Sequence, residues 1–218
     1  MSEFYVIDTE TTGLDSPMRA VEVAWLHINE NMEVLDRHVQ LVNPGRPINP
    51  GASEIHGIYD HHVAQSPEVE NVVSALPKPF VAIAHNVGYD LRVLAEHIEW
   101  NASICTLALA RRWVPEAPNH KLPTLKDFLK LSEQESHSAL GDCYTSLDVL
   151  RVCAERSGRN LKALLELESI PKMLPKMPFG MHKGKAFHEV PASYREWLLS
   201  KPDLHKDLEY TLKKLSFQ

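Results

Sequence analysis

Five side chains of this sequence are of the types that bind metal ions and hydrolyse a phosphodiester bond. Four are carboxylates and one is an imidazole: Asp8, Glu10, Asp90, His137 and Asp142. Mg²⁺ prefers oxygen ligands, and two such ions about 4 Å apart stabilise both the attacking and the leaving oxygen of an in-line displacement. If the fold brings these five residues together, the sequence predicts a metal-dependent nuclease.

The first two acids follow a pattern that is typical of a buried strand. Aromatic and β-branched residues before them predict a strand over residues 4–8. Because side chains alternate along a strand, Asp8 and Glu10 point to the same side. This spacing recurs in acid pairs that read as solvated surface, so alone it is a weak signal. The small-residue loop 11–14 distinguishes this pair, because it lets a substrate backbone approach closely. Glu22 is a weaker candidate for the site, and the alternative is an outward-facing strand residue.

Three segments resemble the motifs of the DnaQ-like 3′–5′ exonucleases, in the subgroup with four acids and one histidine (DEDDh). They are residues 8–14 (DTETTGL), 84–90 (AHNVGYD) and 137–142 (HSALGD), and the last matches the family's H-x-A-x-x-D. One motif could be chance, but three in the family's order make the assignment strong. The resemblance covers residues 3–160, and residues 179–186 are similar to the C-terminal extension of one family member.

The resemblance implies a role for each acid. Asp8, Glu10 and Asp142 would bind a first metal ion, Asp8 would bridge to a second, and Asp90 would hold the second directly or through water. The expected cofactors are therefore two Mg²⁺ or Mn²⁺ ions. Carboxylates at such short range repel one another, so we expect the site to assemble fully only with metal and nucleotide bound.

His137 is the expected general base, since imidazole titrates at about pH 6.5, close to working pH. Apolar spacing after it predicts a helix, on which five positions rotate a side chain by about 140°. His137 and Asp142 therefore cannot share one helical face, and His137 is placed in the loop that enters the helix. His85 stands equally far before Asp90, so spacing alone does not separate the two histidines. The family motif favours His137, and His85 is interpreted as a strand-end histidine that bonds a backbone group.

The resemblance also indicates residues that would contact the substrate. Leu14 would wedge against the terminal base, and Tyr89 would stack on a base. Asn86 would hold the terminal 3′-OH or a phosphate, while His56 matches a loop near the terminal nucleotide and Thr11 belongs to the first motif. The alternatives are core packing for Leu14 and Tyr89 and turn capping for Asn86 and His56.

The elements around these residues predict an α/β fold with a mixed sheet flanked by helices, as in the ribonuclease H-like fold of the family. Strands are expected over residues 4–8, 20–28, 33–42 and 80–84. Residues 43–53 are expected to be a loop. Helices are expected over residues 66–76, around Asp90, and over 106–113, 124–131 and 138–156. The domain organisation would be a catalytic domain (1–164), a proline-containing linker (165–178) and a small C-terminal extension (179–218).

Charge differs between the two ends of the chain, although the whole chain carries a formal charge of −6. Residues 1–170 hold 14 basic and 24 acidic side chains, whereas residues 171–218 hold 9 and 5. The basic C-terminal module, with Lys183 and Lys185 on either side of Gly184, could bind backbone phosphates. The alternative is a packed cap whose lysines are only solvated.

Composition fits a cytoplasmic enzyme. Hydrophobic residues make up 44% of the 218 positions, which is enough for a core. The three cysteines form no C-x-x-C pair, so they indicate neither a disulfide framework nor a zinc site. We expect no signal peptide and no association with membranes, because no apolar run approaches about 18 residues.

Together with the acid residues, the family resemblance implies a metal-dependent 3′–5′ exodeoxyribonuclease that releases nucleoside 5′-monophosphates and acts in DNA repair. Its expected partners are DNA 3′ ends, single-stranded or duplex. One alternative is an exoribonuclease that trims RNA with the same chemistry, because the sequence does not reveal recognition of a 2′-OH. Another is a polymerase-associated proofreading or adaptor subunit. The intact set of five residues argues against an inactive module.

Overall fold

The computed structural model describes residues 3–15, 17–132, 138–170, 173–201, 204 and 206–215. Contacts divide the chain into two compact units, Met1–Glu168 and Ser169–Gln218. Each unit has buried apolar residues of its own.

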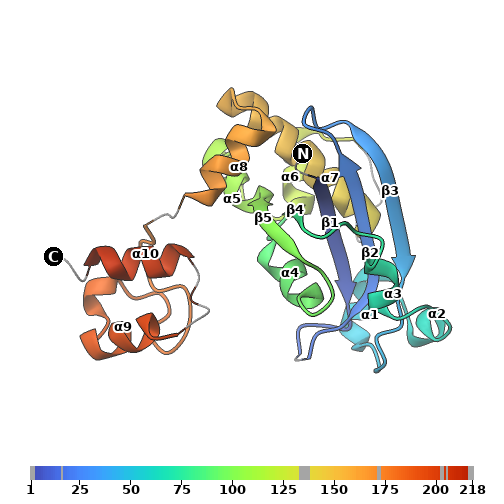
Figure 1. Ribbon diagram of the computed structural model, residues 1–218, viewed down its shortest axis with the longest axis horizontal. Coiled ribbons are helices and arrows are strands. Elements are labelled where there is room, and N and C mark those ends of the chain that lie inside the picture. The colour runs from blue at the N-terminus through green and yellow to red at the C-terminus, as the bar shows by residue number, and fades with distance from the viewer. Residues whose placement is uncertain are drawn as a thin grey trace. The chain divides into compact units, whose positions relative to one another are not determined.

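Five strands form one mixed sheet in the first unit (Figure 1). They are β1 (Phe4–Thr11), β2 (Ala20–Ile28), β3 (Val34–Leu41), β4 (Phe80–Ala84) and β5 (Trp100–Cys105). The order across the sheet is β3-β2-β1-β4-β5. The first three strands pair antiparallel, whereas β1 with β4 and β4 with β5 pair parallel. The sheet is therefore the mixed sheet that the sequence predicts.

Helices connect and follow the strands. The first unit contains α1 (Pro50–His56), α2 (Asp60–Val63), α3 (Val69–Val73), α4 (Gly88–Leu94), α5 (Thr106–Trp113), α6 (Leu122–Leu129) and α7 (Ala139–Ser157). Helix α8 (Leu161–Ser169) ends at the boundary between the units. The second unit contains a short 3₁₀ helix (Phe187–Glu189), α9 (Ala192–Leu199) and α10 (Lys206–Leu215). Among the described residues, no helix combines the length and the apolar character that crossing a membrane requires.

Alternation along β1 decides which helix each of its side chains meets. Phe4 and Val6 belong to the core that α5, α6 and α7 cover, whereas Ile7 belongs to the core on the opposite face, which α3 and α4 cover. Asp8 and Glu10 continue the series of Phe4 and Val6, so they lie on the α7 face. The end of β1 also lies next to α1, because His56 Nε2 is 3.2 Å from the Thr11 carbonyl oxygen.

The structure differs from the predicted elements at strand β5, at helix α3 and in the segment 43–53. Strand β5 was not predicted, because it is an edge strand in which Ile104 alone is buried and no alternation is visible. Helix α3 is shorter than residues 66–76 and begins after Glu68 instead of Ser66. The expected loop 43–53 contains the start of α1, where Pro50 stands at the first helical turn and the Asn49 side chain accepts from the Gly51 N–H. Proline disrupts a helix interior but fits that position.

The C-terminal unit has its own small core. It consists of Met177, Phe187, Val190, Leu198, Leu208 and Leu212. Backbone bonds close the loop 177–185, since Met177 N–H donates to the Lys185 carbonyl (2.9 Å) and Gly184 N–H to the Met177 carbonyl (2.8 Å). Helix α8 extends to residue 169, so the first part of the segment expected as a linker is helical, and Met177 from its end packs in this core.

Candidate active site

Carboxylates from distant parts of the sequence meet at the end of β1. One oxygen from each of Asp8, Glu10 and Asp142 lies within 4.8 Å of the others. Asp142 comes from the first turn of α7, where the Ser138 side chain accepts from the Gly141 N–H (3.2 Å). The next residue, Cys143, is buried with its Sγ 3.5 Å from the Val6 carbonyl, so α7 packs directly on β1. Close packing of helix and strand thus brings Asp142 to the first acid pair.

Asp90 reaches the same end of β1 from helix α4. Only 3% of Asp90 is exposed, and the Thr9 hydroxyl donates to its Oδ1 (2.8 Å). Thr9 points to the α4 face because it alternates with Asp8 and Glu10. Burial is the largest cause of the raised pKa of Asp8, and the Asp90 charge is the second largest. The fold therefore brings together all four acids that the sequence indicates.

Asp8, Glu10 and Asp90 hold protons more tightly than isolated carboxyls do. Burial raises the pKa of Asp8 well above its usual range, and the charges of Asp90 and Asp142 raise it further. Burial raises the pKa of Glu10 to about 7, with Asp142 as the next cause, and burial raises the pKa of Asp90 to about 7. A divalent cation would relieve this repulsion. The three-acid group offers only carboxylate oxygens, which suits Mg²⁺ or Mn²⁺, so the residues fit a metal ion.

Glu22, only a weak candidate from the sequence, is a fifth carboxylate at this site. It lies on β2 opposite Glu10 and is half-buried, so it is not an outward strand residue. Its Oε2 accepts the Ala139 N–H (2.9 Å) at the start of α7. Glu22 thereby ties β2 to the helix that carries Asp142. The register between β1 and β2 would have revealed it, but register is not visible in a single sequence.

A hollow of about 480 Å³ lies beside Glu10. Four of the five predicted substrate-binding residues line it: Thr11, Leu14, His56 and Tyr89. Asn86 is not among the lining residues. Its backbone has a positive φ of 73°, and its carbonyl accepts the Tyr89 N–H (2.8 Å), which agrees with the turn-forming alternative.

Hydrogen bonds fix the walls of this hollow. The hydroxyls of Thr11 and Tyr89 lie 2.7 Å apart. Nδ1 of His56 accepts the Ile58 N–H (3.0 Å), so Nε2 carries the proton and donates to the Thr11 carbonyl (3.2 Å). Burial lowers the pKa of His56, which favours this neutral form.

Leu14 takes no part in core packing, because 82% of it is exposed, and the nearby Ile55 is 62% exposed. Both line the hollow and give it an apolar rim. An exposed apolar rim beside a polar site is suited to a ligand that has an apolar face.

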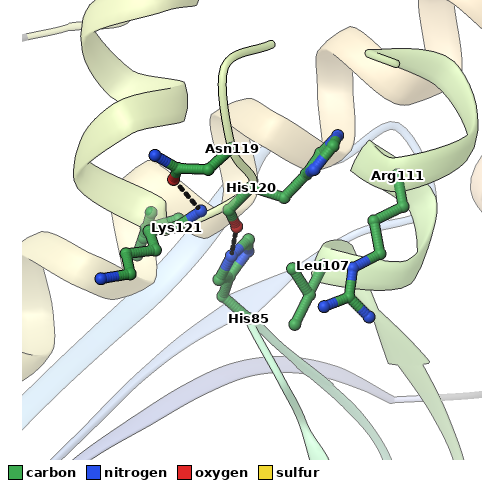
Figure 2. Close-up of a pocket in the computed structure, with 7 residues that line it drawn as sticks. His85, Leu107, Arg111, Asn119, His120 and Lys121 are labelled. Carbon is green, nitrogen blue, oxygen red and sulfur yellow. Dashed lines mark hydrogen bonds between the residues drawn. The ribbon is translucent and has the colours of Figure 1, made fainter. Parts of the chain in front are cut away.

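The two candidate histidines differ in what the structure shows of them. His137 lies outside the described residues, so its role stays a prediction. His85 stands at the end of β4 with its ring facing the 119–121 segment (Figure 2). Its Nε2 lies 2.8 Å from the His120 carbonyl and its Nδ1 lies 3.0 Å from the Thr106 hydroxyl. Both ring nitrogens are engaged, in agreement with the structural interpretation of His85.

Comparison with known proteins identifies the class. The exonuclease family model (RNase_T) matches residues 5–150, and the chain belongs to this family. The chain is 33% identical over 218 residues to exodeoxyribonuclease 10 of Escherichia coli strain K12, which covers 95% of this chain and 96% of that protein.

Solved structures agree. Exonuclease X in complex with 5′ overhanging duplex DNA matches with a TM-score of 0.65 and 32% identity, over 76% of this chain and 99% of that one. E. coli exonuclease I in complex with a dA16 oligonucleotide matches with a TM-score of 0.61 and 19% identity, over 77% and 43% of the two chains, which shows a shared fold. Residues 179–186 of this chain resemble the C-terminal extension of exonuclease X. The predicted family and fold class are confirmed, and the protein is a nuclease hydrolase.

Proposed function

We propose that this protein is a 3′–5′ exodeoxyribonuclease that removes one nucleotide at a time and releases nucleoside 5′-monophosphates. The observation that carries the proposal is the position of four converging acids beside a hollow with an apolar rim. Two similar proteins support DNA as the substrate, since one is named an exodeoxyribonuclease and the other was solved with duplex DNA. A role in DNA repair rests on the resemblance, and a place in the cytoplasm rests on the composition.

Two Mg²⁺ or Mn²⁺ ions are the proposed cofactors. Asp8, Glu10 and Asp142 would hold one ion, and Asp8 and Asp90 would hold the other. When bound, the ions would neutralise charge on the scissile phosphate and on both oxygens of the displacement. The acids alone repel a phosphate, so substrate and metal binding would depend on each other.

The hollow lined by Thr11, Leu14, His56 and Tyr89 would hold the terminal nucleotide. Leu14 and Ile55 would cover a face of the base, and this contact is tolerant of sequence. The Thr11–Tyr89 hydroxyl contact would hold the Tyr89 ring at the wall. Bonded on both ring nitrogens, His56 would keep the Thr11 backbone in place instead of exchanging protons.

His137 would be the general base that takes the proton of the attacking water. It directly precedes Ser138, the N-cap of α7, and therefore lies close in sequence to the helix turn that carries Asp142. His137→Ala should lower the rate roughly 10²–10⁴-fold and leave binding of Mg²⁺ nearly unchanged. His85→Ala should act mainly through stability, because His85 bonds the His120 and Thr106 segments. Equal catalytic losses in two folded variants would contradict this assignment.

A second hollow of about 540 Å³ lies next to His85, and exposed Arg111 and Lys121 line it (Figure 2). These two cations are suited to phosphates of nucleotides that precede the terminal one. Arg111→Ala should therefore raise KM more than it lowers kcat.

The purified chain on single strands labelled at the 5′ end tests the proposal. With Mg²⁺ we expect a descending ladder on DNA, no cleavage of a closed circular single strand, and no activity in excess chelator. Cuts in the circle or full activity in chelator would reject the mechanism. Faster trimming of a matched RNA would support the exoribonuclease alternative. Binding without any turnover would support the adaptor alternative.

A further inference from the structure

The C-terminal unit carries a hollow of about 490 Å³ next to its core. Aromatic side chains of Phe179, Tyr194 and Trp197 line it, together with the side chain of Lys201. Phe179 is 45% exposed and Trp197 is 50% exposed, while the buried core of the unit is made by other residues. Large aromatic surface left open to solvent in so small a unit indicates a contact with something outside it.

The backbone holds these rings in fixed positions. Gly180 has a positive φ of 73°, and a Cβ there would lie 2.6 Å from the Tyr194 hydroxyl oxygen, so this close contact requires glycine. The His182 ring packs edge-on against Tyr194 with centroids 4.7 Å apart. Tyr194 and Trp197, on helix α9, have ring centroids 5.3 Å apart and an interplanar angle of 33°. These contacts place the rings of His182, Tyr194 and Trp197 side by side in one cluster.

One lysine lines the hollow beside Trp197, and two more lie on the loop that contains Gly180. The Lys201 Nζ lies 4.5 Å from the centroid of the Trp197 ring, and Lys183 and Lys185 are exposed on the loop that contains Gly180. None of the lining residues is acidic. The exposed Glu196, next to Trp197, is not among them. Aromatic faces next to lysines are the combination that binds single-stranded nucleic acid, because bases stack on the rings and phosphates meet the ammonium groups.

We propose that this hollow binds an unpaired DNA strand, with a base against Trp197 and Phe179 and backbone phosphates at Lys201, Lys183 and Lys185. The site lies outside the catalytic acids and gives the enzyme a second hold on its substrate. It rests on the proposed function only in taking DNA as the ligand. The competing outcome is that the hollow binds a protein segment instead of DNA. In that case loss of the Trp197 ring leaves the affinity for DNA unchanged.

The experiment uses the full chain and a fluorescent circular oligothymidylate, which has no 3′ end for the exonuclease site. Fluorescence anisotropy in chelator gives the Kd without turnover. Trp197→Leu should weaken binding about fivefold or more, since one stacked base contributes at least about 1 kcal/mol. Trp197→Phe should retain most of the affinity, because it keeps an aromatic face. Lys201→Gln should weaken binding and reduce the salt slope by about 0.7.

Matched controls make each outcome decisive. Lys213→Gln removes an exposed lysine of α10 that pairs with Glu209, and it should leave the Kd unchanged. Lys213→Gln should also degrade a short linear oligonucleotide at the parental rate, and turnover of that oligonucleotide by the parent tests the proposed function separately. An unchanged Kd for both Trp197→Leu and Lys201→Gln overturns the proposal, as does an equal loss in Lys213→Gln. If Trp197→Leu lowers the melting temperature, Trp197→Phe and Lys201→Gln carry the test.

Discussion

The hollow beside the catalytic acids and the hollow on the C-terminal unit are built from similar apolar surface but opposite charge. Leu14 and Tyr89 stand next to carboxylates, whereas Trp197 stands next to Lys201. A phosphate can approach the first only when cations are bound, and it can approach the second without them. The contrast teaches that hydrolysis and attachment to the strand can be separate properties of two regions.

The two regions also differ in how the chain builds them. Asp8, Asp90 and Asp142 come from a strand and two helices that are far apart in sequence, and a rigid sheet with a helix on each face holds them. The hollow of the C-terminal unit comes from a single stretch between residues 179 and 204. Chemistry that needs several oxygens within a few ångströms of one another requires the first kind of framework. Stacking on a base tolerates the second kind.

The largest expected effect is the loss of turnover when a residue of the catalytic region is changed. Asp142→Asn should lower activity more than about 100-fold, because it removes a negative charge from the three-acid group. Mutation of residues that only hydrogen-bond to metal ligands already lowers activity about 10–100-fold, so loss of a ligand charge should lower it further. The variant should stay folded, since it also removes repulsion among the acids. Steady-state cleavage of a short oligonucleotide and circular dichroism measure both outcomes.

Asp148→Asn is the matched control, because Asp148 lies on the same helix but pairs with Arg151. It should retain nearly full activity. Asp142→Asn should also bind the circular strand as the parent does, the mirror image of Trp197→Leu. A parallel loss of turnover and of circular-strand binding in Asp142→Asn would show that the two regions are not separate.

The sequence predicted the parts of the catalytic region that depend on local pattern. The apolar run before Asp8 predicted β1, and the alternation along it predicted that Asp8 and Glu10 share a face. The spacing after His137 predicted α7 within a residue at each end. The three motifs predicted the family, which is confirmed. The individual roles of the site residues stay predictions.

Features that depend on pairing between distant segments could not be predicted. Glu22 meets the start of α7 only because β2 pairs with β1 in the observed register. Strand β5 is defined by its partner β4, since half of its own residues are polar or exposed and only Ile104 is buried. The aromatic hollow required the contact of Tyr194 with Gly180 across the C-terminal unit. Each of these follows from tertiary contacts that one sequence does not display.

A smaller effect is expected at Glu22 and sharpens the description of the acid region. Glu22→Ala should lower activity about 10–100-fold, mainly by raising the Mg²⁺ concentration needed, because the Ala139 N–H loses its acceptor and α7 loses its tie to β2. Glu22→Gln keeps an acceptor and should lose only severalfold. Mg²⁺ titrations of the rate measure both variants. If Glu22→Gln is as inactive as Asp142→Asn, Glu22 is a metal ligand and the acid group has five members.

The smallest expected effect is the dependence of the free energy of unfolding on pH. Glu10 and Asp90 have pKa values of about 7 in the metal-free protein, above the usual carboxyl range of about 4. Between those values the folded chain holds more protons than the unfolded chain, so the free energy of unfolding falls as pH rises through this window. The melting temperature in chelator should therefore drop by several degrees between about pH 5 and about pH 8, at about 2–4 °C per kcal/mol.

Mg²⁺ should reverse this drop, because it takes the place of the protons and stabilises the folded chain more at pH 8 than at pH 5. Asp142→Asn should reduce both the slope in chelator and the gain with Mg²⁺, since the Asp142 charge is one cause of the raised pKa of Glu10. Lys201→Gln, in the other region, should change neither. A melting temperature in chelator that rises with pH, or a gain with Mg²⁺ that is equal in Asp142→Asn and the parent, would mean that repulsion among these acids does not limit the stability of the metal-free protein.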